Sequence, residues 1–243
     1  MLFYLGTHKV NHARYFDKSF ISINVLRNRK SDFFVNDWIM DSGAFTEIST
    51  YGYYRNDVSE YANHINRWRV CGNLEFAVTQ DYMCEPFILN KTGLTVKEHQ
   101  RLTIERYDNL VKLSEVSVLP VLQGYQPNEY QEHLYQYGDR LKIGMRVGVG
   151  SVCKRNSKPK QIVKVLEAIK MIRPDLKLHG FGLKITSLAN NYILSLLYSS
   201  DSMAWSYSAR MNGGNANGLQ EALDFLKQIE KIKGTKAHQF NFE

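Results

Sequence analysis

Apolar, β-rich runs alternate with amphipathic helical patterns along most of the chain. The apolar runs predict eight strands, at residues 2–5, 20–25, 37–41, 74–81, 117–123, 142–149, 176–182 and 198–204. Between and after them, apolar residues recur at helical spacing and predict helices over 56–70, 95–114, 127–137, 158–172, 186–196 and 218–232. Asn56 or Asp57 is placed to cap the first helix, and Thr95 with Glu98 has the spacing of a capping box at the second.

This alternation predicts the α/β class and, with eight strands, a (β/α)8 TIM barrel. The structural alternative is an open doubly wound sheet, which needs fewer strands and a Gly-x-Gly-x-x-Gly turn that is missing after the first strand. A length of 243 residues suits one barrel, and no linker, internal repeat or low-complexity block interrupts the pattern. We therefore expect a single domain over residues 1–243.

Polar or glycine residues stand where six of the predicted strands end. In a parallel barrel these carboxyl ends meet at one mouth, so the six segments predict one site built from many strands. The segments contain Asp41-Ser42-Gly43, Gln80-Asp81, Gln123-Gly124, Gly148-Val149-Gly150, His179-Gly180-Phe181-Gly182 and Asp201-Ser202.

Charge and cysteine content limit the binding partners and the cellular compartment that we expect. The net charge of +7 is compatible with a polyanionic partner, although many basic proteins bind no nucleic acid. The three cysteines, Cys71, Cys84 and Cys153, are widely spaced and form no Cys-x-x-Cys pair, so we expect reduced thiols and no zinc site. The chain has neither an 18-residue apolar run nor a basic leader before its first apolar segment, which predicts a cytoplasmic protein without a membrane span.

Asp41 and Asp201 are the candidate catalytic pair. Each follows a β-like run and precedes a serine, so both are expected to project into the barrel mouth. Two carboxylates across a sugar–base bond can divide glycosyl transfer, because one attacks the anomeric carbon and the other carries a proton to and from the base. The alternative for each is a capping role in the turn after its strand.

Other residues at the strand ends are suited to hold a flat base or a nucleic-acid backbone. Asp81 can accept from the N–H edge of a purine, Gln123 and the Gly124 backbone can bind its carbonyl edge, and Gly148 and Gly150 permit close approach. Tight turns are the alternative for the glycines. Ser42 and Gly43 are candidates for shaping the pocket, and Phe45, Tyr82 and Met145 are candidates for stacking on the base. Contacts near the sugar or phosphate are expected from His179, Gly182 and Lys184. The candidates for phosphate binding are Lys154, Arg155, Lys158, Lys160 and Arg210, and the alternative for all these side chains is ordinary core or solvated surface. Residues 212–215 are expected to form a flexible loop.

The ordered motifs resemble those of the tRNA-guanine transglycosylases. Asp-Ser-Gly-Ala-Phe at 41–45 resembles the Asp-Ser-Gly-Gly-Phe element of that family, and Val-Leu-Gln-Gly at 121–124 and Val-Gly-Val-Gly at 147–150 follow in the same order after Asp81. Gly-Phe-Gly at 180–182 and Asp-Ser-Met-Ala-Trp at 201–205 extend the resemblance. The set is most similar to the compact phage and bacterial branch named DpdA, the transglycosylases that place deazapurines in DNA.

The resemblance implies a TIM barrel that exchanges guanine for a 7-deazaguanine such as preQ0, without ATP or another cofactor. It implies proton transfer by Asp41, base binding by Asp81, and a base pocket lined by Gln123, Gly124, Gly148 and Gly150. The implied partners are DNA and the free 7-deazaguanine base, in the cytoplasm of a bacterial or phage-infected cell. An accessory protein that opens duplex DNA fits the same reaction, and the sequence does not set the number of subunits.

Two departures separate this chain from the tRNA enzymes. Their nucleophile lies in an Asp-x-x-Asp-Cys pattern, whereas a match of Asp201 to its first Asp places Ala204 at the nucleophile. We assign the nucleophile to Asp201, because it is the only acid on the last predicted strand. The tRNA enzymes also hold zinc through a C-terminal Cys/His cluster that this sequence lacks, which favours the DNA branch.

Three alternative functions remain at this stage. The first is the same exchange on tRNA, and the second is a barrel that binds a nucleobase or nucleic acid without catalysis. A glycosylase or nuclease is the third, disfavoured because the sequence shows no acid cluster for a metal. The retained acids Asp41, Asp81 and Asp201 favour an enzyme.

Overall fold

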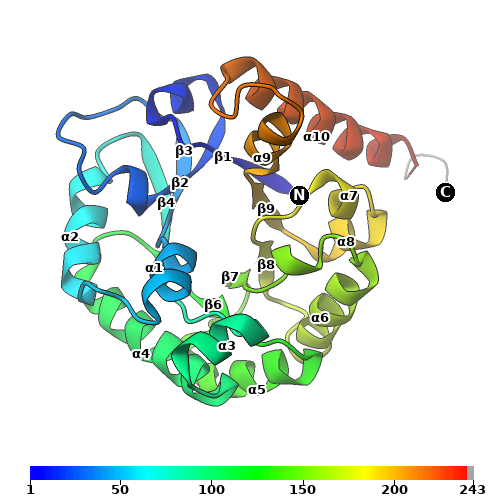
Figure 1. Cartoon of the computed structure of the whole chain (residues 1–243). Coiled ribbons are helices and arrows are strands. Elements are labelled where there is room, and N and C mark those ends of the chain that lie inside the picture. The colour runs from blue at the N-terminus through cyan, green and yellow to red at the C-terminus, as the bar shows by residue number, and fades with distance from the viewer. Residues whose placement is uncertain (240–243) are drawn as a thin grey trace.

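The strands form one parallel sheet that curves around a central axis (Figure 1). The structure is a computed structural model, which describes the backbone of residues 1–239 and the side chains of residues 1–234. Residues 240–243 of the expected domain lie outside the described part of the chain. The strands are β1 (Leu2–Gly6), β2 (Lys18–Ser22), β3 (Asp37–Asp41), β4 (Asn73–Val78), β5 (Val118–Leu119), β6 (Val121–Leu122), β7 (Arg146–Val149), β8 (Lys177–Gly180) and β9 (Ser199–Ser202).

The two edges of this sheet, β5 and β6, are the two halves of one predicted strand. β5 pairs with β4 through Val78 and Leu119, whereas β6 pairs with β7 through Val121 and Gly148. Between the halves stands Pro120, which has no N–H to donate to the ladder, although its carbonyl accepts from the Gly148 N–H at 2.8 Å. The chain itself therefore joins one edge to the other, and the predicted (β/α)8-type barrel is confirmed.

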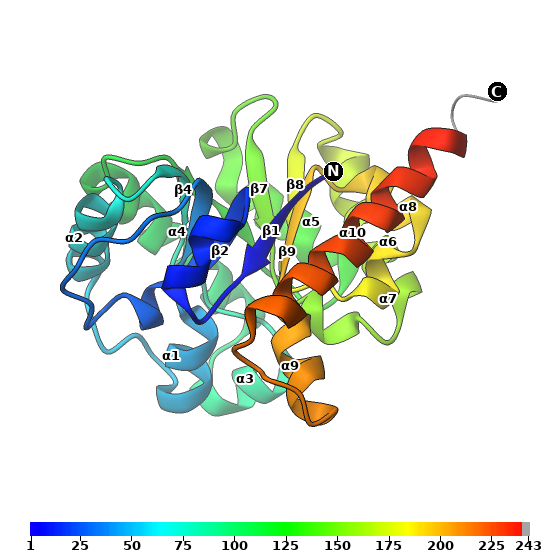
Figure 2. The ribbon, with the colours of Figure 1, turned by 90° about the horizontal axis from the view of Figure 1, so that it is seen from above.

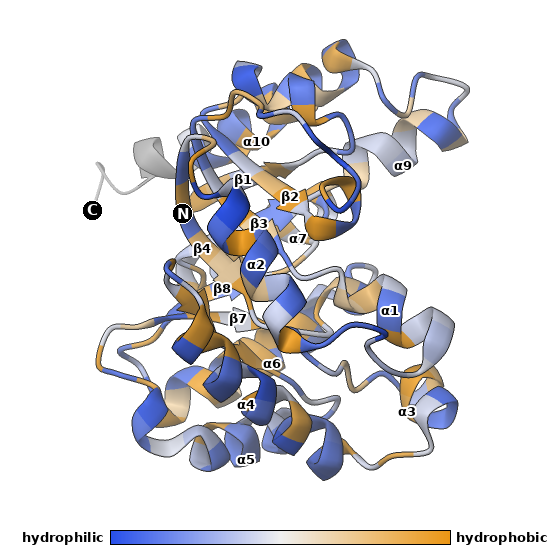
Figure 3. Cartoon of the chain, turned by 90° about the vertical axis from the view of Figure 1, so that its left-hand side faces the viewer, coloured by the Kyte–Doolittle hydropathy of each residue, from blue (hydrophilic) through white to orange (hydrophobic). Residues whose placement is uncertain are grey.

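An outer ring of helices covers the sheet, as the helical patterns predict. The ring consists of α2 (Val58–Trp68), α4 (Val96–Leu113), α5 (Pro127–Tyr137), α6 (Pro159–Ile172), α7 (Ile185–Leu188), α8 (Asn191–Leu196) and α10 (Leu219–Gln239). Asp57 caps α2, and Thr95 and Glu98 form the predicted capping box of α4. Figure 3 shows hydrophobic and hydrophilic residues alternating along α4 and α5, which is typical of helices with one buried face.

Short elements account for most differences from the predicted pattern. Three helices were not predicted, α1 (Ala44–Tyr51), α3 (Pro86–Thr92) and α9 (Ala204–Met211), because a helix of two turns shows little periodicity. The predicted strands at 20–25 and 198–204 end early, at Ser22 and Ser202, and the strand predicted at 142–149 begins only at Arg146. The helix predicted at 186–196 is broken at Asn190, whose side chain caps α8. The 3-10 segments are η1 (Val10–Tyr15), η2 (Ile23–Val25), η3 (Gly138–Arg140) and η4 (Cys153–Arg155).

The three unpredicted helices mark the functional end of the barrel. α1 follows β3, α3 follows β4 and α9 follows β9, so each begins near the carboxyl end of a strand. In Figure 2 they lie together on the side of the barrel opposite the N-terminus. They therefore surround the mouth at which the polar strand ends meet.

Alternation along each strand sorts side chains between the interior of the barrel and the helices. On β3, Ile39 belongs to a small apolar cluster with Tyr4 and Phe20, whereas its neighbours Trp38 and Met40 belong to the large cluster that contains the helix faces. Asp41 stands two residues beyond Ile39, on the same face of the strand. Because side chains alternate between the two faces of a strand, the Asp41 carboxylate lies at the mouth of the barrel, above the apolar cluster that contains Ile39. No helix in the described part of the chain is long and apolar enough to cross a membrane.

Candidate active site

A cavity of about 320 Å³ opens at the carboxyl ends of the strands. This volume lies within the range of small-molecule sites, and three carboxylates, Asp41, Asp81 and Asp201, all line it. The strands β3, β4 and β9, far apart in sequence, therefore deliver acids to one place. The other lining residues are Phe20, Ser22, Ala44, Phe45, Val78, Met83, Glu85, Gln123, Gly150, Ser151, Cys153, Lys154, Phe181, Gly182 and Met203.

Asp41 is held at its strand end by local donors. Its Oδ2 accepts from the Gly43 N–H at 3.2 Å, and Ser22 on the neighbouring strand supplies a side-chain hydrogen bond. Burial raises the pKa of Asp41, and the nearby charge of Asp201 raises it further. A carboxyl with a raised pKa holds its proton more readily at neutral pH, which suits a group that must give a proton to a leaving base.

Asp201 is oriented by a backbone donor and by a buried histidine. Its Oδ1 accepts from the Gly182 N–H at 3.1 Å and contacts His179 Nε2 at 3.2 Å. The other ring nitrogen, Nδ1, lies 2.9 Å from Ser199 Oγ, and the ring stacks on Phe20 with a centroid separation of 5.8 Å. His179 lies beneath the cavity wall and is fully buried, so the geometry makes it a support for Asp201.

The departure from the tRNA enzymes at the nucleophile position has a structural counterpart at this strand. Asp201 lies within β9, whereas Ala204 is the first residue of α9 and is not part of the cavity wall. The cavity therefore contains one carboxylate from the last strand and its following helix.

Asp81 and Gln123 form a hydrogen-bonded pair in the cavity wall. Gln123 Nε2 donates to Asp81 Oδ2, and Gln123 Oε1 accepts from the Ser151 hydroxyl at 3.1 Å. Asp81 is 7% exposed, and burial raises its pKa to about 7, although the Gln123 hydrogen bond opposes the shift. A small change of pH near neutrality thus decides whether Asp81 is a carboxylate that accepts from a ligand or a neutral acid.

Several buried polar residues fix Gln123 and Gly150 from behind. The Gln123 N–H donates to His133 Nδ1 at 2.8 Å, and Gln100 Nε2 donates to the Gln123 carbonyl at 2.8 Å. Tyr130, from the same helix as His133, donates its hydroxyl to the Gly150 carbonyl at 2.8 Å. Sequence reasoning missed these three residues. Each of the three places a polar group on the otherwise apolar face of a helix, and buried polar groups rarely lack a hydrogen-bond partner. That pattern in the sequence could have indicated their role.

The glycines at positions 148 and 150 leave space for larger groups. A Cβ at Gly148 would lie 2.4 Å from the Phe181 ring, and one at Gly150 would lie 2.2 Å from Gln123 Nε2. Either side chain would displace a residue of the cavity wall. Gly124 instead packs against Glu129 and Tyr130 on α5, away from the cavity.

The Ser42 to Phe45 segment is divided between support and cavity wall. Ser42 is fully buried, and Gly43 has a φ of 72° and packs against Asn24, so both lie behind Asp41. Phe45 lines the cavity and is 48% exposed at its rim, with Phe87 of α3 at a centroid distance of 6.5 Å. Phe20 and Phe181 complete the aromatic wall.

The predicted basic residues do not form one cluster. Lys154 lines the cavity, and its Nζ lies 4.4 Å from the centre of the Phe45 ring. Arg155 is buried and donates to the Tyr125 carbonyl, so it supports a loop. Lys184 lies at a separate cavity of about 510 Å³ between α7, α9 and α10, and Arg210 is exposed on α9.

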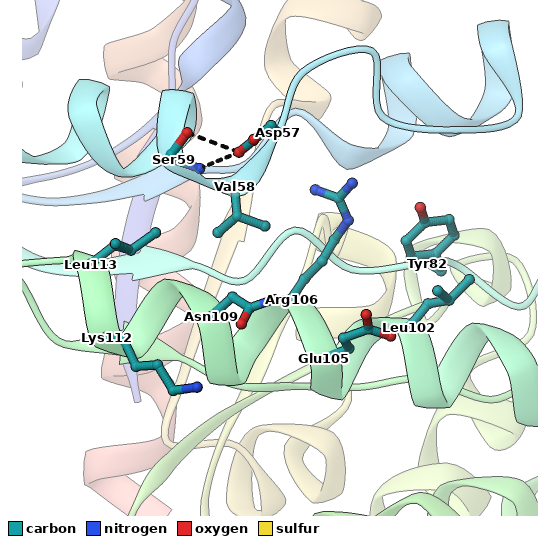
Figure 4. A pocket seen from close by; sticks show the side chains of 10 residues that line it. All are labelled: Asp57, Val58, Ser59, Tyr82, Leu102, Glu105, Arg106, Asn109, Lys112 and Leu113. Carbon is teal, nitrogen blue, oxygen red and sulfur yellow. Dashed lines mark hydrogen bonds between the residues drawn. The ribbon is translucent and has the colours of Figure 1, made fainter.

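A further cavity of about 490 Å³ lies outside the barrel, between α2 and α4 (Figure 4). Arg106 extends into it from α4, donates to Gln80 Oε1 at 2.8 Å, and stacks on Tyr54 at 4.3 Å. Tyr54 in turn donates to the Asp81 carbonyl at 2.7 Å. Tyr82, a candidate for stacking on a base, lines this outer cavity and not the mouth, whereas Met145 packs against the core. Arg106 and Tyr54, beside the outer cavity, therefore hold the backbone of the Asp81 loop from outside the barrel.

Among residues 1–234, whose side chains the structure describes, no group of three or more His, Cys, Asp or Glu side chains is placed to hold a metal ion. Cys71, Cys84 and Cys153 are all free.

Most of the chain matches a protein-family model. The family is described as "DpdA: DeoxyPurine in DNA protein A", and the match covers residues 1–222. No curated protein matches the chain. The matched range includes every residue of the cavity wall at the mouth.

Proposed function

Because the chain belongs to the DpdA family, whose membership implies a transglycosylase-type enzyme of DNA modification, we propose that it exchanges guanine in DNA for a 7-deazaguanine base. The main structural support for this proposal is that Asp41, Asp81 and Asp201 all line one cavity at the barrel mouth. Two of these acids serve the glycosyl transfer and the third binds the base. The incoming base is preQ0 or a derivative of it.

Binding of the target base comes first. A guanine enters the cavity, extruded from the stack if the DNA is duplex. Its N–H edge donates to Asp81, and its carbonyl accepts from the second Nε2 hydrogen of Gln123. Phe45 at the rim stacks on the base, and Lys154 contacts a phosphate. The fixed backbone of Gln123, bonded to His133 and Gln100, supports this orientation.

The exchange then takes two steps at the anomeric carbon. An Asp201 oxygen forms a bond to C1′ while the C1′–N9 bond breaks, and the Asp41 proton passes to the departing guanine. Next, Asp41 takes the N9 proton of the deazaguanine, whose N9 bonds to C1′ while the ester to Asp201 breaks. The hydrogen bond from the Gly182 N–H and the contact with His179 hold Asp201 for this attack. A deoxyribose has no electron-withdrawing 2′-hydroxyl, so its oxocarbenium-like transition state is reached more easily than that of a ribose.

The test is base exchange on DNA and on tRNA in parallel. Labelled guanine is exchanged into each nucleic acid by the wild-type protein, Asp41→Asn and Asp201→Asn, and DNA binding is measured separately. We expect exchange on DNA alone, lost in both variants while DNA binding is kept. Exchange on tRNA alone would support the tRNA enzyme, and DNA binding without exchange by the wild type would support a non-catalytic barrel.

A further inference from the structure

Glu85 contributes a fourth acid to the cavity that the proposed reaction does not use. It lies in the cavity wall, is 3% exposed, and its Oε2 has no hydrogen-bond partner among the described residues. Glu85 precedes α3 at the N-cap position, yet its side chain makes no capping hydrogen bond. A buried polar atom without a partner is costly, so a side chain that could cap the helix but faces the cavity is available to a ligand.

The polar groups of the wall stand in a definite order. Asp81 is bonded to Gln123, Gln123 is bonded to Ser151, and the Ser151 hydroxyl is close enough to Glu85 for a hydrogen bond. Ser151 has a φ of 60°, an uncommon conformation for a residue with a side chain. The backbone there is strained where it brings the hydroxyl between Gln123 and Glu85.

The groups along one side of a guanine have a matching order. From the N1–H edge, the next group is the carbonyl oxygen, and the next is position 7 of the five-membered ring. With N1–H at Asp81 and the carbonyl at Gln123, position 7 faces Ser151 and Glu85. N9 then lies on the remaining side, where the base joins the sugar and where Asp41 and Asp201 must act.

The charge balance of the cavity favours a positive group at that position. Asp41, Asp81, Glu85 and Asp201 line the cavity, and Lys154 is the only Lys or Arg among the described lining residues. Lys154 lies over the Phe45 ring, and no ion pair joins it to Glu85 within the described side chains. Burial raises the pKa of Glu85, although the Ser151 hydroxyl and the charges of Lys154 and Arg155 oppose the shift, so the cost of a buried charge there is only partly offset. A cationic substituent at position 7 of the base would pair with the Glu85 carboxylate and remove that cost. A nitrile substituent at the same position is only a hydrogen-bond acceptor and cannot donate to the carboxylate.

We propose that Glu85 binds the substituent at position 7 of the incoming base, and that the preferred base is a 7-deazaguanine with a cationic aminomethyl group. This inference rests on the proposed function and narrows its substrate. Glu85 acts on selection of the base and takes no part in breaking the glycosidic bond.

The experiment compares three free bases as substrates for exchange into the same DNA: guanine, 7-cyano-7-deazaguanine and 7-aminomethyl-7-deazaguanine. Wild-type kcat/KM should be about tenfold or more higher for the aminomethyl base than for the cyano base, as a charge-assisted hydrogen bond provides. Glu85→Gln should lower kcat/KM for the aminomethyl base by about 10- to 100-fold, mainly through KM, because the pairing charge is lost. Guanine has no substituent at this position, so its exchange should fall much less than that of the aminomethyl base.

Two further variants separate selection from folding. Glu85→Asp keeps the charge and should retain the preference for the aminomethyl base, and Glu132→Gln, on the exposed face of α5, should behave as the wild type. Guanine exchange by Glu85→Gln shows that this variant is folded. Guanine exchange with equal use of the two deazaguanines, or a preference unchanged in Glu85→Gln, would overturn the inference while leaving the proposed function standing. Absence of exchange with all three bases would overturn both.

Discussion

At the amino-terminal end of the barrel the charged groups form ion pairs, whereas Asp41, Asp81 and Glu85 in the mouth cavity have no ion pair among the described side chains. At the amino-terminal end, Lys18 Nζ lies 2.5 Å from Asp37 and 3.0 Å from Glu75, and Arg146 Nη1 lies 3.2 Å from Glu75. Tyr4 joins this amino-terminal network by donating to Glu75 at 2.8 Å, and burial raises its pKa to about 12, so it remains a donor. Each acid in the network thus has a cation or a hydroxyl as its partner.

At the mouth, the carboxylates face one another across the cavity. Burial raises the pKa of Asp41, Asp81 and Glu85, which means that the folded chain resists placing charge there. Unpaired buried acids reduce stability, and such groups cluster at sites of chemistry. One end of the barrel therefore has paired charges that stabilise the fold, whereas burial of the acids at the mouth reduces stability, as expected for the reactive site that we propose there.

The largest expected effect is on catalysis at the mouth. Asp41→Asn or Asp201→Asn should lower base exchange by about 10³-fold or more, since each removes a proton-transfer or nucleophilic group. The melting temperature should stay equal or rise in Asp41→Asn, because burial disfavours the charge of this acid, and should change little in Asp201→Asn, because the amide oxygen can still accept from the Gly182 N–H. Exchange rates and thermal unfolding are measured on the same preparations. Loss of exchange together with a lower melting temperature would mean that these acids support the fold.

The second effect is on stability at the opposite end. Arg146→Met should lower the free energy of unfolding by about 2 to 3 kcal/mol, because Glu75 keeps only Lys18 as a cationic partner and Tyr4 loses the Arg146 donor. The exchange rate below the melting temperature should be unchanged. Urea unfolding checks this, with Arg101→Met as the control, since the Arg101–Glu105 pair is exposed on α4 and contributes little. Equal effects of the two variants would show that the amino-terminal network contributes no more to stability than an exposed ion pair.

The third effect has the opposite sign. Asp81→Asn should stabilise the chain by about 2 kcal/mol at pH 8 and by little at pH 4. The unfolded chain ionises this aspartate near its ordinary pKa, whereas the folded chain keeps the proton until about pH 7. Ionisation of Asp81 therefore lowers the free energy of unfolding increasingly between these two pKa values, and the loss is complete above about pH 7. Urea unfolding of wild type and variant at both pH values measures it, and a gain that is independent of pH would contradict the assignment.

The smallest effect is the pH dependence of base binding. A guanine N–H edge needs Asp81 as a carboxylate acceptor, so KM for free guanine should rise about tenfold from pH 8 to pH 6, as expected for a pKa of about 7. In Asp81→Asn this pH dependence should disappear. Steady-state exchange between pH 6 and pH 8 checks both. A KM that falls with decreasing pH would show that the protonated acid binds the base.

The barrel and its acids were predictable from sequence because both depend on local patterns. Apolar runs indicated the strands, and the residue ending each run indicated the mouth, so Asp41, Asp81 and Asp201 were found. The resemblance to DpdA is confirmed by the family match. Glu85 and His133 were missed as parts of the site, because their roles depend on how α3 and α5 pack against the barrel. Arg155 carries the same charge as Lys154 one residue away, and only the fold shows that one is buried and the other faces the cavity.

The most direct test of the central claim is mass spectrometry of nucleosides from DNA incubated with the protein and a free 7-deazaguanine base, both preQ0 and its aminomethyl counterpart. The account predicts a 7-deazaguanine deoxynucleoside in DNA treated with the wild-type protein and its absence with Asp201→Asn. Unmodified DNA after treatment with the wild type, or equal modification by the variant, would contradict it.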